Sequence, residues 1–208
     1  MKRVFSSLIL ALGLLAVPAQ AADYPTKPIT LMTAFNAGGG SDVSHRLLEK
    51  FAKGVFDQPI VVTYKAGAGG EIGWTWLAGA KPDGYTIGGV DLPHIVLQPM
   101  LRPEGQPGYK TEQLSPLCGL VYDADVVMVP EAGPHTTFKD LIAYARANPG
   151  KVKVATVGRL TGDHLFLMQI EKLTGAKFTQ VPYSGSGKAI PALLSGEVDA
   201  YFGSGSSF

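Results

Sequence analysis

Short apolar, β-branched runs alternate along the chain with longer segments whose apolar residues recur every three to four positions. Runs of four to eight such residues bounded by Gly or Pro predict buried strands, and the longer period predicts helices. Strands are therefore predicted at 29–35, 60–64, 85–90, 126–129, 152–156, 178–181 and 198–202. Helices are predicted from about Ser41 or Asp42 to Val55, and at 71–80, 138–148, 163–174 and 188–195.

This order of elements predicts an α/β fold in which each of two lobes is a doubly wound, mostly parallel sheet. In such folds ligands bind at the carboxyl ends of the strands. The stretch 99–116 is dense in Pro, Gly and polar residues without periodicity, which indicates a connector between lobes. We divide the chain into a signal peptide (1–21), lobe I (22–101), a connector or hinge (102–125) and lobe II (126–208).

The N-terminus has the form of a secretory signal peptide. Lys2 and Arg3 precede a mostly apolar run from Val4 to Val17, and Ala19-Gln20-Ala21 follows as an A-x-A cleavage site. We expect cleavage after Ala21 and a periplasmic mature protein. No later stretch approaches the length of a membrane span, so the mature chain is not expected to cross a membrane.

The charge balance narrows the class of partner. The chain has 18 basic and 17 acidic residues, and removal of Lys2 and Arg3 leaves 16 basic residues, for a net charge near −1. A balanced surface argues against nucleic acid or an anionic membrane as the main partner. Cys118 is the one cysteine, which excludes an intramolecular disulfide, and we expect it to be a small buried apolar residue.

Two glycine-rich loops each join a predicted strand to a predicted helix: Phe35–Asp42 (FNAGGGSD) and Gly67–Gly70 (GAGG). Glycines expose backbone N–H groups to close approach, and a helix N-terminus adds partial positive charge. Such a place suits an anion, for example a carboxylate, without a cationic side chain. The alternative is that the glycines only form a tight turn, with Ser41 or Asp42 as helix cap.

Two loops of the second lobe have the same character, 158–163 (GRLTGD) and 183–187 (YSGSG). Thr161, Ser184 and Ser186 are placed to cap the following helices, and capping is compatible with contact to an anion. Arg159 is placed either to pair with a ligand carboxylate or to remain a solvated loop residue.

Sequence signatures of enzymes and cofactor sites are missing. Neither glycine loop completes G-x-G-x-x-G, since Val43 and Ile72 stand at the third glycine, and no G-K-[ST] follows. No G-x-S-x-G surrounds any serine. His45, His94, His135 and His164 lack the spacing of metal ligands. We therefore predict a binding protein without metal or cofactor, and not an enzyme.

Four motifs in this order carry a resemblance to a known family: AFNAGGGSDVSHRLLEK, KAGAGGEIGWTWLAGAKPDGYTI, NPGKVKVATVGRLTGDHL and VPYSGSGKAIPALLSGEVDAYF. The chain resembles the tripartite tricarboxylate transporter substrate-binding receptors, the Bug or TctC-like family. The resemblance implies a periplasmic solute receptor of the type II-like flytrap form. Such a receptor captures a small organic carboxylate between two lobes and delivers it to inner-membrane transporter subunits.

The resemblance also implies the ligand-binding residues, through backbone N–H groups, hydroxyls and bridging waters. In lobe I these are Phe35, Asn36, Gly38, Gly39, Gly40, Ser41, Asp42, Ala68, Gly69 and Gly70, and in lobe II Thr161, Tyr183, Ser184, Gly185 and Ser186. Three candidate residues depart from the family pattern: Asp91, His94 and Arg159. A carboxylate at Asp91 would repel a plain diacid and favour a ligand that carries an amine.

Family members are longer, so the resemblance implies that the chain is C-terminally truncated. In that case a sheet edge and apolar helix faces of lobe I are expected to be exposed, and the chain to be prone to aggregation. Two alternative functions share these features: a ligand-sensing domain for a signalling partner, and a secreted α/β hydrolase that uses one of the serines.

Overall fold

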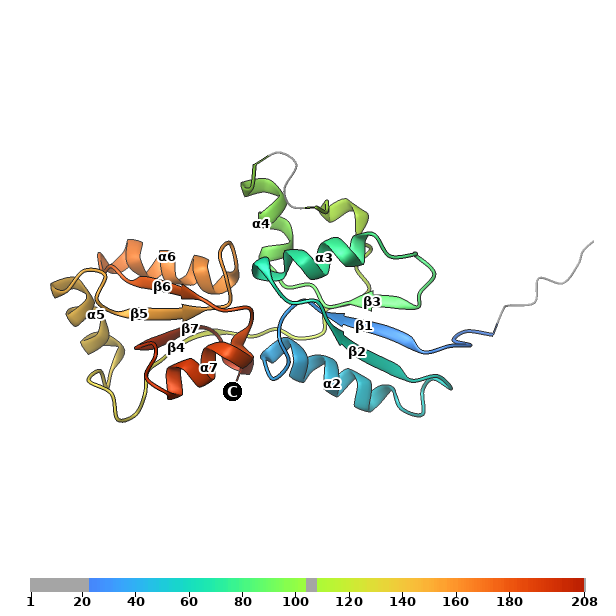
Figure 1. Cartoon of the computed structure of the whole chain (residues 1–208), viewed down its shortest axis with the longest axis horizontal. Helices are drawn as coiled ribbons and strands as arrows, with labels where there is room; N and C mark the ends of the chain where they lie inside the picture. The colour runs from blue at the N-terminus through green and yellow to red at the C-terminus, as the bar shows by residue number, and fades with distance from the viewer. Residues whose placement is uncertain (1–22, 104–107, 208) are drawn as a thin grey trace, which may run out of the picture.

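The computed structural model describes residues 23–103 and 108–207, so the predicted signal peptide lies outside the described residues. Two sheets lie end to end, one in each lobe (Figure 1). The first is entirely parallel in the order β2-β1-β3, with β1 at Ile29–Thr33, β2 at Ile60–Tyr64 and β3 at Thr86–Gly88. The second has the order β4-β7-β5-β6, with β4 at Asp125–Met128, β5 at Lys153–Thr156, β6 at Thr179–Pro182 and β7 at Ala200–Ser204. Only β4 runs antiparallel to its neighbour.

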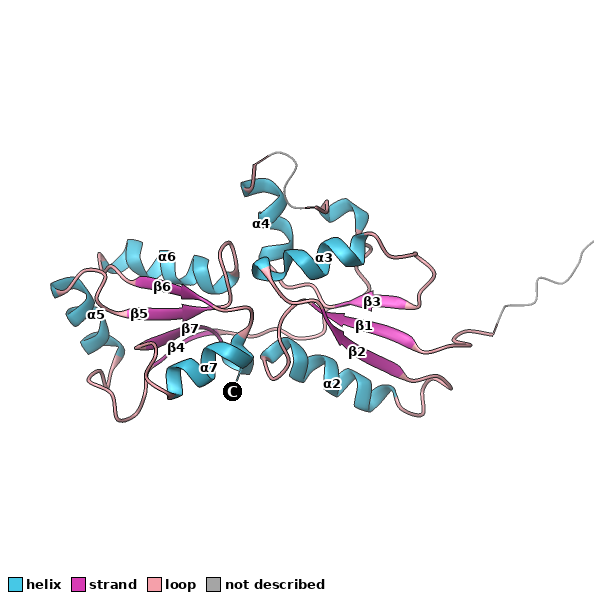
Figure 2. Cartoon of the chain, in the orientation of Figure 1, coloured by secondary structure: helices cyan, strands magenta, loops and turns pink. Residues whose placement is uncertain are grey.

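Helices cover both faces of each sheet, which confirms the predicted doubly wound α/β fold. In Figure 2, α2 and α3 lie on opposite faces of the first sheet, and α6 and α7 on opposite faces of the second. The helices are α2 (Gly40–Ala52), α3 (Glu71–Ala78), α4 (His94–Leu101), α5 (Phe138–Ala147), α6 (Gly162–Thr174) and α7 (Ser186–Leu194), with 3₁₀ turns η1 (Ala68–Gly70), η2 (Thr111–Gln113) and η3 (Gly205–Ser207). In the part of the chain described, none of these helices combines the length and apolar character that a membrane crossing requires.

Both sheets point the carboxyl ends of their parallel strands at the junction between the lobes (Figure 1). The loops that follow β1, β2, β5 and β6 therefore meet there. One buried apolar cluster runs through the junction: it joins Met32, Phe35 and Trp74 of lobe I to Ala155, Ala189 and Tyr201 of lobe II. The lobes are thus in contact in this structure, with the glycine loops between them.

Helix α4 corrects the prediction that 99–116 is a plain connector, because the helix runs through Pro99 to Leu101. Proline removes the N–H that would bond the carbonyl of Ile95 inside the helix. That carbonyl instead accepts hydrogen bonds from the hydroxyls of Tyr109 and Thr111, each at 3.1 Å. Contacts from residues far along the chain thus compensate the proline, and Tyr109 itself is buried in the core.

The expectation of a buried Cys118 was wrong, because its side chain is exposed. Residues 115–124 form neither helix nor strand and are exposed throughout, so nothing covers the thiol. This segment leads into β4 of the second sheet, and its role as a hinge stays a prediction.

Helix α2 exposes an apolar stripe. Val43, Leu47 and Phe51 lie four residues apart and are 49%, 49% and 70% exposed, while the buried residues of α2 are Gly40, Asp42 and His45. Contiguous exposed apolar surface promotes association. The sequence-based expectation of an uncovered apolar helix face in lobe I is confirmed.

We expect the purified chain to self-associate through this stripe, and Phe51→Lys to reduce the association without loss of fold. Lys at this position keeps helix propensity and removes the most exposed ring of the stripe. Light scattering coupled to size exclusion measures the mass of both proteins, with Phe138→Lys, an exposed aromatic of lobe II, as control. A monomeric wild-type chain with a sharp cooperative melt would contradict this prediction.

Candidate functional site

The N-termini of α2 and α7 face each other across the lobe junction (Figure 1). Gly39 caps α2 and Gly185 caps α7, and neither helix has a side-chain cap. A Cβ placed on Gly39 would lie 2.6 Å from Ser186 Oγ and 3.3 Å from Gly187 N. The first glycine loop of lobe I and the YSGSG loop of lobe II therefore meet at van der Waals distance.

A second pair of helix N-termini, those of α3 and α6, meets beside the first. A Cβ on Gly69 would lie 3.0 Å from both the carbonyl oxygen of Arg159 and Cγ2 of Thr161. A Cβ on Gly158 would lie 3.0 Å from the Cα of Gly69. The second glycine loop thus packs directly on the GRLTGD loop.

The glycines serve both the turn and the close approach of the lobes. Gly38, Gly69 and Gly70 have φ of +79°, +67° and +97°, which favour glycine. Gly185 lies close to Asn36, whose N–H donates to the carbonyl of Ser184 at 3.3 Å and so bridges the lobes. The glycines form the predicted turns, and they also allow close approach of the other lobe. The predicted close approach of a ligand stays a prediction.

The electrostatics of the α2/α7 junction favour an anion. Each helix directs partial positive charge at the same place, and two such ends repel each other in a poorly solvated environment. Hydroxyls of Ser186 and Ser206 lie beside Gly39 and Gly40. The cationic side chains of the lobe II loops, Arg159 and Lys188, are exposed. An anion there would meet backbone N–H groups and hydroxyls, the donor set of a helix N-terminal anion site.

Asp42 braces the first glycine loop from within. Its carboxylate accepts the N–H of Gly38 at 2.8 Å and the hydroxyl of Tyr64 at 2.7 Å, and lies 3.3 Å from Nε of Arg46. Burial raises the pKa of Asp42, but the hydrogen bonds and the Arg46 charge outweigh it and lower that pKa below its ordinary value. The hydrogen bond from Gly38 to Asp42 therefore stabilises the conformation of the first glycine loop.

We expect Asp42→Asn to lower the free energy of unfolding at pH 7 by about 1–2 kcal/mol, because charge-assisted hydrogen bonds are lost. A carboxyl with a lowered folded-state pKa stabilises above its unfolded pKa near 4, and that stability is lost as the pH falls through the folded value. Urea unfolding at several pH values tests this. Glu49→Gln is the matched control, since Glu49 pairs with the same Arg46 but contacts no loop N–H. Equal losses in both variants would contradict the prediction.

Asp91 reaches the same junction from the loop after β3. Its Oδ1 accepts the hydroxyl of Ser41 at 3.2 Å, at the N-terminus of α2. Burial raises the pKa of Asp91 to about 6 although the Ser41 bond lowers it. The carboxylate has no cationic partner among the described residues, so its ionised form is poorly compensated.

The raised pKa of Asp91 predicts a loss of stability as the pH rises from about 4 to about 6, since the fold disfavours the ionised form. Asp91→Asn is expected to remove this loss and to be more stable than wild type above pH 6 by about 2–3 kcal/mol. Thermal or urea unfolding between pH 4 and pH 8 measures the difference, with exposed Asp57→Asn as control. A constant difference across that range would show that the prediction is wrong.

His94 lies at the second junction, between α3 and α6. Its ring nitrogens are 3.2 and 3.3 Å from the N of Gly162, which donates a hydrogen bond to the imidazole. The ring is 7% exposed and lies edge-on to Phe35 and Trp74, with centroids 6.1 Å apart. Burial lowers the pKa of His94 to about 4, so the imidazole is neutral near pH 7.

The remaining candidate residues differ in burial and in hydrogen-bond partners. Thr161 is fully buried, caps α6 by accepting the N–H of His164, and donates to the carbonyl of Gly158 at 2.8 Å. Tyr183 donates its hydroxyl to Oε1 of Glu197 at 2.8 Å. Ala68 is exposed, and its carbonyl accepts from Arg102. The structure brings together the backbone of 35–41, Asp91, His94 and 184–186. The Tyr183 hydroxyl instead bonds Glu197, and the Arg159 side chain is exposed.

Sequence reasoning missed two residues of the junction. Gln98 is fully buried and its Nε2 donates to the carbonyl of Gly69 at 2.8 Å, while its Oε1 has no partner among the described residues. Ser206 lies in η3 against Gly40, and its Oγ is 2.9 Å from that of Ser204. Gln98 precedes the proline that obscured α4, and Ser206 stands in a short GSGSS run without a recognisable motif.

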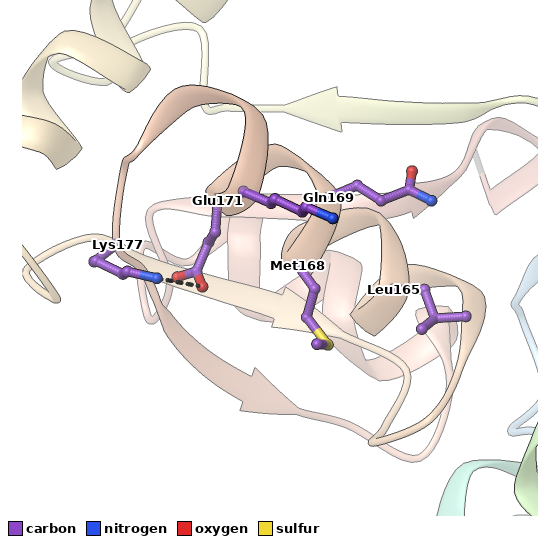
Figure 3. A pocket seen from close by; sticks show the side chains of 6 residues that line it. Leu165, Met168, Gln169, Glu171 and Lys177 are labelled. Carbon is purple, nitrogen blue, oxygen red and sulfur yellow. Dashed lines mark hydrogen bonds and ion pairs between the residues drawn. The ribbon is translucent and has the colours of Figure 1, made fainter. Parts of the chain in front are cut away.

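A separate surface hollow of about 530 Å³ lies along α6. Leu165, Met168, Gln169, Glu171, Lys172 and Lys177 line it (Figure 3). Two of its charged side chains already form an ion pair, since Lys177 Nζ lies 3.4 Å from Glu171. The hollow is open to solvent and none of the four junction loops lines it, so the lobe junction remains the candidate site. Across the described residues, no three His, Cys, Asp or Glu side chains are grouped to hold a metal ion.

Two α/β lobes whose strand-end loops meet at one junction define the class of two-lobed solute-binding proteins. The family model described as tripartite tricarboxylate transporter family receptor matches residues 44–206. The chain belongs to this family, the TctC or Bug receptors, as its motifs predicted. The family consists of periplasmic binding proteins and not of enzymes, which removes the hydrolase alternative.

Individual relatives agree with the assignment. The chain is 36% identical over 190 residues to a UPF0065 protein in the gbd 5' region of Cupriavidus necator, covering 90% of this chain and 57% of the relative. The structure of periplasmic binding protein BugD matches with a TM-score of 0.78 at 30% identity, over 88% of this chain and 60% of that one. Rpa4515 of R. palustris with adipate matches with a TM-score of 0.77 at 27% identity, over 88% and 60%. The chain thus spans about three fifths of the length of these relatives.

Proposed function

We propose that this protein is a periplasmic receptor that captures a small organic carboxylate between its lobes and delivers it to inner-membrane transporter subunits. The observation that carries the proposal is the opposition of the α2 and α7 N-termini, with Gly39 and Ser186 in contact. Two facing helix N-termini without a buried cation form an environment that an anion stabilises. A family relative whose structure holds adipate supports a carboxylate as the anion.

The mechanism is closure of the two lobes on the ligand. Lobe I contributes the N–H groups around Gly39 and Gly40, and lobe II contributes the hydroxyls of Ser186 and Ser206 beside them. Closure removes water and strengthens each of these hydrogen bonds. Since the ligand contacts both lobes only when they are closed, its binding shifts the population toward the closed form, which the transporter subunits recognise.

Asp91 adds a preference within this class of ligands. Its carboxylate lies beside Ser41 at the α2 N-terminus, where it would repel a second carboxyl group and attract an amine. Equal affinity of Asp91→Asn and wild type for amino-acid ligands would remove this role. The predicted signal peptide, with its expected cleavage after Ala21, supports export to the periplasm.

A thermal-shift screen against mono-, di- and tricarboxylates and amino acids tests the function, followed by isothermal titration of the best ligand. We expect an upward shift for one class, because a ligand that binds only the folded protein raises its melting temperature. The carboxamide of the best ligand is the control, since it keeps the shape and removes the charge. A cooperative melt that no carboxylate shifts would overturn the proposal.

A further inference from the structure

The second pair of helix N-termini, at α3 and α6, differs from the first because a side chain of this chain already lies in it. The N–H of Gly162, in the first turn of α6, donates to the His94 ring at 3.2 to 3.3 Å. A Cβ on Gly162 would lie 3.1 Å from Cε1 of His94. The imidazole therefore uses a donor of the α6 N-terminus and fills the space in front of it.

We propose that His94 is a specificity-determining residue that closes the α6 N-terminus to a second acidic group, so that the protein selects carboxylates whose remaining part carries no negative charge. This inference rests on the proposed function, since it concerns the other end of the ligand held at α2 and α7. It assigns the substrate class as monocarboxylates, with dicarboxylates excluded.

The surroundings of His94 support this assignment. Its edge-on contacts with Phe35 and Trp74 and its low exposure leave it a neutral hydrogen-bond acceptor, with a pKa of about 4. The ring nitrogen that accepts the N–H of Gly162 offers a carboxylate no donor. The neutral imidazole keeps a single N–H, on its other nitrogen, and carries no charge to pair with a carboxylate.

Other charges near the junction act in the same direction. Asp91, in the loop that leads into α4, adds a carboxylate with Ser41 as its bonded partner. Arg159 is the cation of the GRLTGD loop, and its side chain is exposed while its backbone carbonyl faces Gly69. Arg102 donates to the carbonyl of Ala68 at this junction, but its charge is already paired with Glu71. A second acidic group would thus meet Asp91 and His94 without an unpaired cation beside them among the described residues, and would lose its water without compensation.

Paired ligands of equal length give the direct test on the purified wild-type protein. Isothermal titration compares hexanoate with adipate, and butanoate with succinate. We expect the monocarboxylate of each pair to bind at least about tenfold more tightly, because an uncompensated charge costs at least one charge-assisted hydrogen bond. Tighter binding of the dicarboxylates would overturn the inference and leave the proposed function intact. If no carboxylate of either kind binds, the proposed function fails as well.

Variants then test whether His94 is the cause. His94→Ser frees the N–H of Gly162 and supplies a hydroxyl donor, so the affinity ratio of adipate to hexanoate is expected to rise about tenfold. His94→Gln keeps an acceptor for Gly162 and is expected to keep the wild-type ratio. His135→Ser is the control, since His135 is also buried but packs against Tyr144 in lobe II. An unchanged ratio in folded His94→Ser would overturn the role of this residue, and the wild-type ratio decides the substrate class even where that variant does not fold.

Discussion

Gly187→Ala is expected to keep both lobes folded and to prevent the closed contact between them. A Cβ on Gly187 would overlap the carbonyl oxygen of Ala37 in the first glycine loop. Because this oxygen belongs to the backbone, no side-chain rotation can relieve the overlap. The lobes would have to separate, so the donors of Gly39 and Ser186 would no longer reach one anion. We expect carboxylate affinity to fall by at least about a hundredfold, since charge-assisted hydrogen bonds from one whole lobe are lost.

The same substitution favours α7 itself, which makes the result easy to interpret. Gly187 is the second residue of α7, and alanine is favoured over glycine in a helix, by about 1 kcal/mol in the interior and less in the first turn. Thermal melting should therefore be unchanged or higher while binding is lost. X-ray scattering should show a larger radius of gyration that ligand no longer reduces. Gly119→Ala is the control, because no atom lies within 4 Å of a Cβ there. Wild-type affinity in Gly187→Ala would show that this contact is not part of the ligand-binding state.

The helices and strands were predictable from the sequence because the spacing of apolar residues within each segment reflects which of its residues are buried. The run ITLMT alternates little and is apolar, and it forms the central strand β1 with a buried pattern. The run IVVTY forms β2 with the predicted bounds. Thr137, which stands directly before the apolar period of α5, accepts the N–H of Asp140 at 3.1 Å and caps that helix. Patterns that reflect local periodicity or capping thus determine both the elements and their order.

Features that depend on distant partners were not predictable in this way. Helix α4 survives Pro99 because hydroxyls from Tyr109 and Thr111 bond the freed carbonyl of Ile95. The residues around Pro99 in the sequence give no sign of these two hydrogen bonds, because their donors lie 14 and 16 residues after Ile95. Gln98 holds Gly69 across 29 residues, and its role follows from the packing of α4 on the second glycine loop. The sequence predicted an anion site at the glycine loops, and this stays a prediction. Only the structure shows that these glycines also allow one lobe to contact the other.

Trp74→Ala is expected to destabilise the protein by about 3–5 kcal/mol, a large part of the stability of an ordinary domain. Trp74 is fully buried in the cluster that spans both lobes, and its ring lies edge-on to Phe35, His94 and Tyr109 at 6.0 to 6.2 Å. Its Nε1 donates to the carbonyl of Gly89 at 3.1 Å. Removal of the indole leaves a cavity behind both glycine loops and an unpaired carbonyl at Gly89. His94 also loses the ring contact that packs it against Gly162.

Trp76→Ala is the matched control from the same helix, because Trp76 is 39% exposed and contacts Lys65. We expect this substitution to cost about 1 kcal/mol or less. Urea unfolding of the two variants gives the comparison, and similar losses in both would mean that the core shared by the lobes does not hold them together.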